Sequence, residues 1–396
     1  MSAVLKSRFK SEIMKKILES AKRVFNYYLT ASYQWLVPIK KNRFVFLCMQ
    51  GNSFGDSVKC ISDYVEKHYE NADIIWAFSK YYIDKVDCAH TKVRFGSLRY
   101  FYYCVSSKYF VTNCLSSKMC FKRDGQKLMQ TWHGTALKRI ALDEACRDHS
   151  SLYYALRPDL YTECAKNTDY FISGSHFMTT VYHRAFAYPN KIYEIGTPRN
   201  DIYFKDCSEI IEKVKKSLSI EKNKKIILYA PTFRSDGSFE FYDVDLGKIK
   251  RYFEDNTGNE YEIVARLHPG IVSESGKFEH LVGRGVINAS LYPDVQELLY
   301  AVDVLVTDYS SVMFDFMYLR RPVIMYVPDR DKYNRGFYFD IDELPFLVAN
   351  NNDEITTVLS KYDSVEYMKR IDAFLEKIGS VENGRATENA YELLMS

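Results

Sequence analysis

Short apolar runs rich in β-branched and aromatic residues recur from residue 44 onward, and longer polar or amphipathic stretches separate them. This alternation is typical of parallel sheets whose strands are joined by crossover helices. The runs form two sets of candidate strands: Phe44–Cys48, Ile74–Phe78, Tyr109–Thr112, Lys127–Thr131, Tyr170–Ile172 and Ile192–Ile195, then Ile226–Tyr229, Glu262–Ala265, Val286–Asn288, Val304–Thr307 and Val323–Tyr326. We therefore predict an α/β protein with two doubly wound, Rossmann-like lobes.

The length of the chain also favours two lobes. Its 396 residues exceed the roughly 250 to 300 residues at which a single hydrophobic core stops growing. The turn-rich segment Gly196-Thr-Pro-Arg-Asn-Asp201 lies between the two sets of strands, where it would connect the lobes. The expected division is 1–42 as a separate N-terminal segment, 43–203 as an N-terminal domain, and 204–396 as a C-terminal domain that includes the C-terminal helices.

The N-terminal segment is strongly basic. Residues 1–43 contain ten Lys or Arg and two Glu, in a chain whose net charge is only +3. Apolar residues recur there at helical spacing from Leu5 to Leu29, with basic residues between them, which predicts a basic amphipathic helix with an anionic partner rather than a nucleic-acid site. Two interpretations stay open: the helix lies on an anionic membrane surface, or it packs on the body of the protein. The uncharged stretch Val24–Ile39 is too short and too polar to span a bilayer.

The sequence lacks several familiar motifs. Nine scattered cysteines without a Cys-x-x-Cys pair, together with the lack of a visible secretory signal, predict a reducing cytoplasmic location without zinc or disulfides. The phosphate-loop, Gly-x-Gly-x-x-Gly and Gly-x-Ser-x-Gly motifs are missing, which argues against NTPase, dinucleotide and hydrolase functions. The segment Asp329-Arg-Asp331 resembles a metal-binding Asp-x-Asp, but it lies in a charged loop, so we expect it to be solvated and assign no metal.

Polar motifs follow directly after predicted strands, where facing doubly wound lobes bind their ligands. In the first lobe, His133 follows Gln130-Thr-Trp132. The small neighbours Gly134 and Thr135 would let a substrate approach the imidazole, and Lys138 suits a phosphate. A histidine of near-neutral pKa could take a proton from an alcohol. The alternative is a buried histidine with a structural hydrogen bond.

Two further motifs follow strands of the second lobe. His268 lies in Arg266-Leu-His-Pro269, where it could donate to phosphate oxygens or protonate a leaving phosphate, although a histidine at a strand end is more often structural. The segment from Val304 to Asp315 reads as a strand, a turn with Ser310 and Ser311, and a helix. A helix N-terminus binds phosphate through its free amides and positive dipole end, although the serines could simply cap the helix.

Read together, these segments resemble the CDP-glycerol:poly(glycerophosphate) glycerophosphotransferase family of teichoic-acid and capsule synthesis. The resemblance covers roughly residues 127–340, with its blocks in family order: Gln130-Thr-Trp-His-Gly-Thr-Ala-Leu-Lys138, Asp169-Tyr-Phe-Ile-Ser-Gly-Ser175 with Ala185-Phe186, Gly196-Thr-Pro-Arg-Asn-Asp201, Ile227-Leu-Tyr-Ala-Pro-Thr-Phe-Arg234, Arg266-Leu-His-Pro269 and Thr307-Asp-Tyr-Ser-Ser-Val-Met-Phe-Asp315. Six blocks in order carry far more weight than any one motif.

The resemblance implies a GT-B-type fold, an acceptor-side N-terminal domain, a C-terminal domain that binds a CDP-activated donor, and peripheral attachment to the cytoplasmic face of the cell membrane. It implies transfer of glycerol phosphate from CDP-glycerol to a lipid-linked acceptor, with release of CMP and without metal or cofactor. By motif position the catalytic residues would be His133 and His268, and His133 would act as the base. The acceptor side would hold Gly134, Thr135 and Lys138, and donor binding would involve Arg199, Arg234, Arg266, His268, Thr307, Asp308, Ser310 and Ser311.

Several alternatives stay open from the sequence. The donor could be CDP-ribitol, or the protein could be a GT-B nucleotide-sugar transferase or epimerase that uses a UDP-sugar. A protein of another class, a non-catalytic envelope-assembly protein, would bind lipid-linked intermediates through the basic N-terminus. The sequence does not separate a primase from a polymerase, and it leaves the oligomeric state open.

Overall fold

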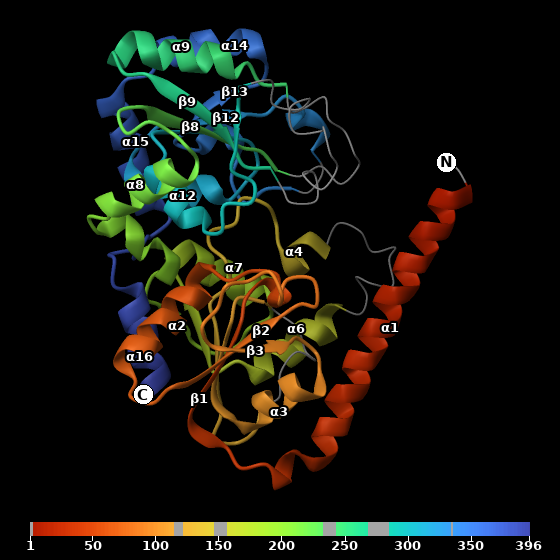
Figure 1. Cartoon of the computed structure of the whole chain (residues 1–396). Coiled ribbons are helices and arrows are strands. Elements are labelled where there is room, and N and C mark those ends of the chain that lie inside the picture. The colour runs from red at the N-terminus through yellow and green to blue at the C-terminus, as the bar shows by residue number, and fades with distance from the viewer. Residues whose placement is uncertain (1–2, 115–121, 146–156, 233–242, 268–284, 334–335) are drawn as a thin grey trace.

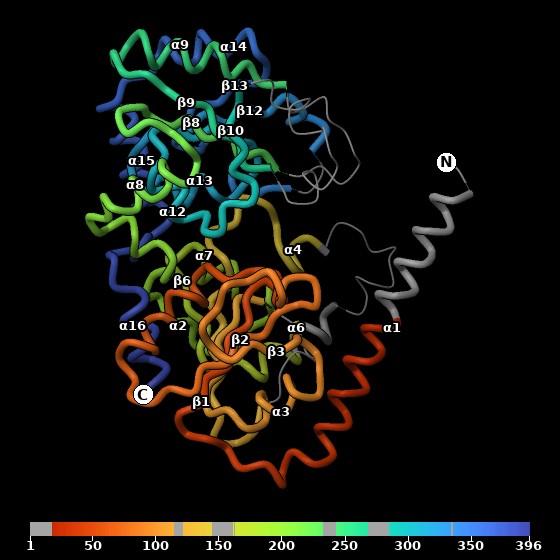
Figure 2. Tube along the Cα trace, viewed as in Figure 1, coloured from red at the N-terminus to blue at the C-terminus, as the bar shows by residue number. Residues whose placement is uncertain are grey.

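The computed structural model of the chain describes residues 3–114, 122–145, 157–232, 243–267, 285–333 and 336–396. It has two α/β lobes, one above the other in Figure 1, and the long helix α1 (Ala3–Tyr33) runs along the side of the first lobe. The tube in Figure 2 shows the chain passing from the first lobe into the second and returning to the first at its C-terminal end.

The first lobe is built on a seven-stranded sheet in the order β3-β2-β1-β4-β5-β6-β7, with every pair parallel. Its strands are β1 (Lys40–Leu47), β2 (Asp73–Phe78), β3 (Thr91–Arg94), β4 (Ser107–Thr112), β5 (Lys127–Gln130), β6 (Tyr170–Ser173) and β7 (Ile192–Glu194). Its helices are α2 (Asp56–His68), α3 (Leu98–Ser106), α4 (Ala141–Ala145), α6 (Arg157–Asn167) and α7 (His176–Ala185).

The second lobe is built on a six-stranded parallel sheet in the order β10-β9-β8-β11-β12-β13. Its strands are β8 (Lys225–Ala230), β9 (Tyr261–Ala265), β10 (Ile287–Asn288), β11 (Val304–Thr307), β12 (Val323–Tyr326) and β13 (Leu347–Ala349). The helices that follow the connecting 3-10 helix η3 (Pro198–Phe204) are α8 (Ser208–Ser217), α9 (Leu246–Thr257), α12 (Val295–Ala301), α13 (Val312–Phe316), α14 (Asn352–Ser360), α15 (Ser364–Lys377) and α16 (Ala386–Met395).

The two parallel sheets confirm the predicted fold class, and all eleven predicted runs lie on observed strands. The strands β3 and β13 were not predicted. Both lie at sheet edges, where a strand is covered on fewer sides and needs fewer apolar residues. In β3 only Val93 is buried, and β13 has only three residues, so neither forms a clear apolar run.

The first sheet has an apolar core on each of its two faces. Successive side chains along a strand point to opposite sides of the sheet, so each strand contributes to both cores. In β1, Phe44 and Phe46 pack with α2 on one face, while Val45 and Leu47 pack with α3 on the other. Helix α16 follows the second lobe in sequence, yet its Leu394 is buried in the core of the first lobe beside α2. The residue limits of the domains stay a prediction.

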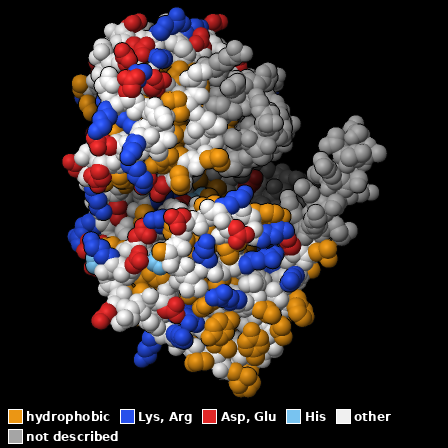
Figure 3. Space-filling model, in the orientation of Figure 1, with side chains coloured by type: hydrophobic (Ala, Val, Ile, Leu, Met, Phe, Trp, Pro, Cys, Tyr) orange, Lys and Arg blue, Asp and Glu red, His pale blue; other side chains and the backbone are white. Residues whose placement is uncertain are grey.

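Helix α1 packs on the first lobe along one side. The ring centroids of Tyr27 and Phe101 in α3 are 5.8 Å apart, and buried Asn26 donates from Nδ2 to the carbonyl of Gly96 over 3.0 Å. Other apolar side chains stay exposed around this helix, on the short helix η1 (Gln34–Leu36) and on α3: Leu18, Phe25, Tyr28, Leu29, Trp35, Leu36, Leu98 and Tyr102. Figure 3 shows hydrophobic side chains gathered at this end of the molecule. Among the described residues, no helix combines the length and the apolar character needed to cross a membrane.

Candidate active site

The turn after β5 holds His133 in an unusual backbone conformation. Trp132 has φ +51° and Gly134 has φ +98°, and left-handed backbone is uncommon for a large residue such as tryptophan. The turn is held by a hydrogen bond of 2.8 Å from the Trp132 amide to Oε1 of Gln130. The indole stacks on the imidazole with ring centroids 4.0 Å apart, which fixes the orientation of His133.

One ring nitrogen of His133 forms a hydrogen bond with the protein backbone. Nδ1 lies 3.3 Å from the carbonyl oxygen of Asn113, at the end of β4, and this oxygen can only accept. Nδ1 therefore carries the proton, and Nε2 keeps its lone pair. Burial lowers the pKa of the imidazole below its usual value, and Arg199 lowers it further against the pull of Asp56. His133 is consequently neutral at physiological pH, as a general base must be.

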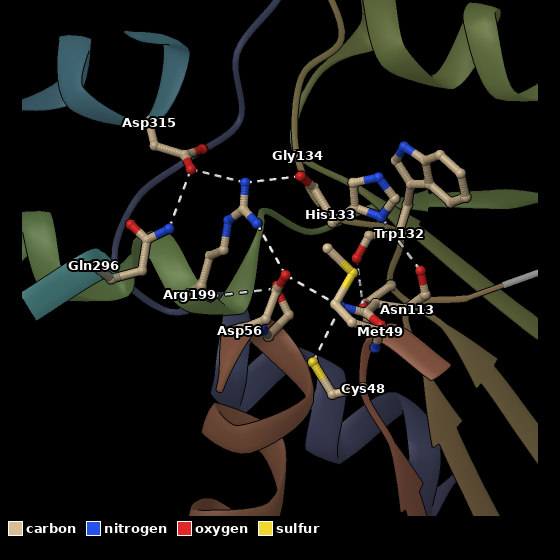
Figure 4. A network of polar contacts seen from close by, with 12 residues as sticks. Cys48, Met49, Asp56, Asn113, Trp132, His133, Gly134, Arg199, Gln296 and Asp315 are labelled. Carbon is tan, nitrogen blue, oxygen red and sulfur yellow. Dashed lines mark hydrogen bonds and ion pairs between the residues drawn. The ribbon is translucent and has the colours of Figure 1, made fainter. Parts of the chain in front are cut away.

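Arg199 joins both lobes next to this turn (Figure 4). Its Nη1 donates to Asp56 at the start of α2 over 3.0 Å, and its Nη2 donates to Asp315 in α13 over 2.7 Å. Nη2 also donates to the backbone carbonyl of His133 over 2.8 Å. Burial opposes the charge on Arg199, but Asp315 and Asp56 outweigh it and raise the pKa of the guanidinium. The guanidinium thus holds His133 in place by its main chain and ties α13 to α2.

The missing side chain at Gly134 makes room for Arg199. A Cβ at position 134 would lie 2.3 Å from Nη2 of Arg199 and 3.3 Å from Oδ1 of Asp315. The positive φ of Gly134 also belongs to the region that glycine favours. Glycine is therefore needed here for the buried ion pairs of Arg199. The sequence had suggested a different reason for a small residue, namely access of a substrate to the imidazole of His133.

Three members of this network were not predicted as site residues. Asn113 donates to Asp56 over 3.1 Å and accepts from the Met49 amide over 2.8 Å. Asn113 directly follows β4, so the rule that polar residues at strand ends form the site could have found it. Asp315 belongs to the quoted Ser-Ser block. Asp56 lies in a stretch with little recognisable pattern, and only the fold brings it to Arg199.

Apart from Arg199 on η3, the predicted donor residues that the structure describes lie at or just after the ends of β9 and β11. Thr307 is fully buried, with its hydroxyl donating to the carbonyl of Ala230 over 2.7 Å, and Asp308 accepts from the Thr232 amide over 2.8 Å. These two side chains brace β11 against the loop after β8. Arg266 donates from Nη1 to the carbonyl of Tyr292 over 2.7 Å, and burial lowers its pKa.

Ser310 and Ser311 lie in the predicted turn. Ser311 is the N-cap of α13 but makes no side-chain capping bond, and the hydroxyl of Ser310 is 3.5 Å from the Val312 amide. On the first lobe, Lys138 pairs with Phe337 in a β-bridge, and its Nζ lies 6.0 Å from the centre of the Tyr333 ring. Thr135 is half-buried beside it.

Two predicted residues, His268 and Arg234, lie outside the described residues, so their roles rest on the sequence alone.

The expectation that Asp329 is solvated was wrong. Asp329 is buried and accepts a hydrogen bond of 3.0 Å from the hydroxyl of Tyr309, because the loop folds onto the aromatic side chains after β11. Within the described ranges, no group of three or more His, Cys, Asp or Glu could hold a metal ion.

Comparison with known proteins gives the same family from sequence and from structure. Residues 29–396 match the family described as CDP-Glycerol:Poly(glycerophosphate) glycerophosphotransferase. A teichoic acid poly(glycerol phosphate) polymerase from Bacillus spizizenii is 31% identical over 98% of this chain and 100% of its own length. One of the same name from Bacillus subtilis is 31% identical over 97% of this chain, which spans only 54% of that relative. A solved structure of the wall teichoic acid polymerase TagF matches with a TM-score of 0.79 at 30% identity, over 100% of this chain and 98% of that one.

Proposed function

Because the chain belongs to the CDP-Glycerol:Poly(glycerophosphate) glycerophosphotransferase family, we propose that it transfers glycerol phosphate from CDP-glycerol to a hydroxyl of a lipid-linked acceptor or growing polymer. CMP is the second product, and the polymer is a wall teichoic acid or a capsule polysaccharide. The observation that carries the proposal is the His133 imidazole, held neutral with its Nε2 unprotonated at the carboxyl end of β5.

In the proposed reaction, the acceptor oxygen forms a bond to the phosphorus that carries glycerol. The bond from this phosphorus to the oxygen bridging to the cytidylyl phosphorus breaks, and CMP leaves with that oxygen. The proton of the acceptor hydroxyl moves to Nε2 of His133. Catalysis depends mainly on positioning and on charge stabilisation, as in other phosphoryl transfers.

The donor diphosphate would lie between the lobes, at the carboxyl ends of β9 and β11. His268, Arg234, Ser310 and Ser311 are assigned to it by motif position. Arg266 and Asp308 support this assignment because their hydrogen bonds fix the chain ends next to these residues, at Arg266 and at Thr232. Arg199 already has three protein partners, so we assign it to positioning His133, and direct contact with the donor stays a prediction.

The test is nucleotide release from purified protein given an acceptor and one donor: CDP-glycerol, CDP-ribitol or a UDP-sugar. We expect CMP from CDP-glycerol. The variant His133→Ala should lose about 10²- to 10⁴-fold in kcat, because it lacks the general base. The matched control is His90→Ala, since His90 precedes the edge strand β3 and so lies at the amino ends of the parallel strands, whereas His133 lies at their carboxyl ends. Turnover of UDP-sugars alone would contradict the proposed function, and near-normal turnover by His133→Ala would contradict the role of the base.

The same assay gives a pH dependence. His133 must be neutral to act, so kcat/KM should fall as the pH drops through its pKa. Because the pKa is lowered from the usual value of about 6.5, this acidic limb should lie below that pH. A limb well above pH 7 would mean that another group is the base.

We also propose peripheral attachment to the cytoplasmic face of the cell membrane through α1. The sequence left membrane binding and packing as alternatives. The contact between one side of α1 and α3 supports packing on the protein. The exposed side chains of Phe25, Tyr28 and Leu29 support membrane binding by the same helix. An apolar face flanked by basic residues is typical of helices that lie in the interface of an anionic membrane.

A further inference from the structure

A cavity of about 630 Å³ lies between α1 and the loops that follow β2 and β3. Five basic side chains line it, against the single acidic side chain of Glu19: Lys22, Arg23, Lys80, Arg94 and Arg99. This concentration of positive charge stands out because the chain after residue 43 has more acidic than basic residues. A cavity lined by one sign of charge attracts ligands of the opposite sign.

Most of these cations have no ion-pair partner among the described side chains. Lys80 pairs with Glu19, while Arg23 and Arg99 lie over the Phe95 and Tyr103 rings, 5.5 and 5.8 Å from their centres. Lys22, Arg94 and Arg99 are exposed, and none of the side chains that the structure describes forms an ion pair with them. Three cations thus remain available to an anionic ligand.

The cavity also offers neutral hydrogen-bond donors. The first amides of α3 have no partner within the helix, and Ser97 caps only the amide of Tyr100. Amides at a helix N-terminus together with basic side chains form a typical site for phosphate.

The loop after β1 and Asn113, which follows β4, connect this cavity to His133. Met49, Gln50 and Gly51 have φ values of +46°, +54° and +83°, so three consecutive residues adopt left-handed backbone. Gln50 lines the cavity, while the Met49 amide bonds to Asn113, whose carbonyl oxygen receives Nδ1 of His133.

Contacts between Gly51 and Ser79, which follows β2, hold this left-handed backbone in place. The Ser79 amide donates to the carbonyl of Gly51 over 2.8 Å, and a Cβ on Gly51 would lie 2.5 Å from the Ser79 nitrogen. Backbone strain of this kind tends to persist at functional sites.

We propose that this cavity binds a phosphate group of the acceptor and so positions the acceptor hydroxyl at His133. The inference rests on the proposed function and names a subsite for it. Each transfer leaves a phosphodiester next to the new terminal hydroxyl, so an acceptor that already carries glycerol phosphate presents an anion close to the reacting oxygen. The cavity is bordered by α1, whose exposed apolar residues would hold the lipid end of the same molecule.

The variants Arg94→Gln and Arg99→Gln test this subsite. The substrates are two water-soluble acceptor analogues, one ending in a glycerol phosphate unit and one lacking the phosphate. Loss of one charge-assisted contact should raise KM for the phosphorylated analogue about tenfold. KM for CDP-glycerol, kcat, and KM for the uncharged analogue should not change. The matched control is Arg251→Gln, because Arg251 is exposed on α9 of the second lobe.

Vesicle binding separates the acceptor from the other source of phosphate, a lipid headgroup. If both variants keep the acceptor KM but bind anionic phospholipid vesicles more weakly, the cavity takes headgroups and the proposal is overturned. Unchanged values in both assays overturn it as well. If the unaltered protein releases no CMP from CDP-glycerol, the proposed function itself fails, and this result is distinct from a change confined to the variants.

Discussion

At the scale of single residues, the position of His133, the proposed base, depends on the space that Gly134 leaves open. Arg199 enters this space to reach the His133 carbonyl and Asp315. Breaking a buried ion pair by displacing one partner is costly, because it leaves a charge without compensation. The network around Arg199 therefore requires a small residue next to His133.

We predict that Gly134→Ala lowers kcat at least about tenfold and destabilises the protein by about 1–3 kcal/mol, since its Cβ would displace Arg199 and strain the backbone. The matched control is Gly125→Ala. Gly125 also has a positive φ, +84°, but a Cβ there would have nothing within 4 Å. The control should lose only about 1–2 kcal/mol of stability through its left-handed backbone, with normal turnover. CMP release and urea unfolding measure both effects, and equal loss of activity in both variants would contradict the explanation.

Sequence patterns point to single residues more readily than to the contacts between them. His133 could be chosen because it follows an apolar run and precedes small residues. Its partner Asn113 follows another strand at the same edge. The pairing of Asp56 with Arg199 joins residues 143 positions apart, and no local pattern encodes such a separation. The buried hydroxyl of Thr307 likewise serves the protein backbone, although its place after a strand suggested a ligand contact.

At the scale of elements, the segment Gly196–Asp201 contacts three parts of the molecule. Arg199 reaches the candidate active site, and Asp201 accepts from the amides of Ala386 and Thr387 at the start of α16 over 2.9 and 2.8 Å. Between them, the Thr197 amide donates to both carboxyl oxygens of Glu382, over 2.9 and 3.0 Å. The turn-rich sequence predicted a connection between lobes, and the structure adds that the returning chain is hydrogen-bonded to it.

Glu382 gives this connection a pH dependence, because burial raises the pKa of its carboxyl group to about 8. The unfolded chain would have the ordinary value near 4.3, so the folded state binds the proton more tightly. The resulting stability is fully present below the unfolded pKa and is lost as the pH rises through the folded pKa of about 8. Between the two pKa values the folding constant falls by up to about tenfold for each pH unit.

Glu382→Gln should remove this loss, because the neutral amide cannot ionise. Urea unfolding between pH 5 and pH 9 measures the difference in slope between the variant and the unaltered protein. Glu376→Gln, at an exposed position of α15, is the matched control and should keep the slope. If Glu382→Gln and the unaltered protein show parallel curves, Glu382 is not the responsible group.

At the scale of the whole molecule, one end combines the apolar surface around α1 with the basic cavity. Trp35 and Leu36 in η1 are 73% and 64% exposed, and burying them in a bilayer would stabilise binding. The double variant Trp35→Ser with Leu36→Ser should weaken binding to anionic phospholipid vesicles at least about tenfold, while turnover of a soluble acceptor stays normal.

Sedimentation with vesicles measures this effect. Leu291→Ser is the matched control, since Leu291 is 79% exposed but belongs to the second lobe. Equal binding by the double variant and the unaltered protein would rule out this end of the molecule as the membrane contact.

The return of α16 to the first lobe also bears on how the protein is made. A ribosome delivers the strands of the first sheet first, but Ala390 and Leu394 complete the apolar core on one face of that sheet. Helix α2 already packs on that face, but the part that α16 covers remains open while the whole second lobe is synthesised. The first lobe is thus begun first and finished last, and the second lobe is an insertion between the first sheet and its final helix. A chain halted anywhere within the second lobe would carry an unfinished first lobe, even with all seven of its strands present.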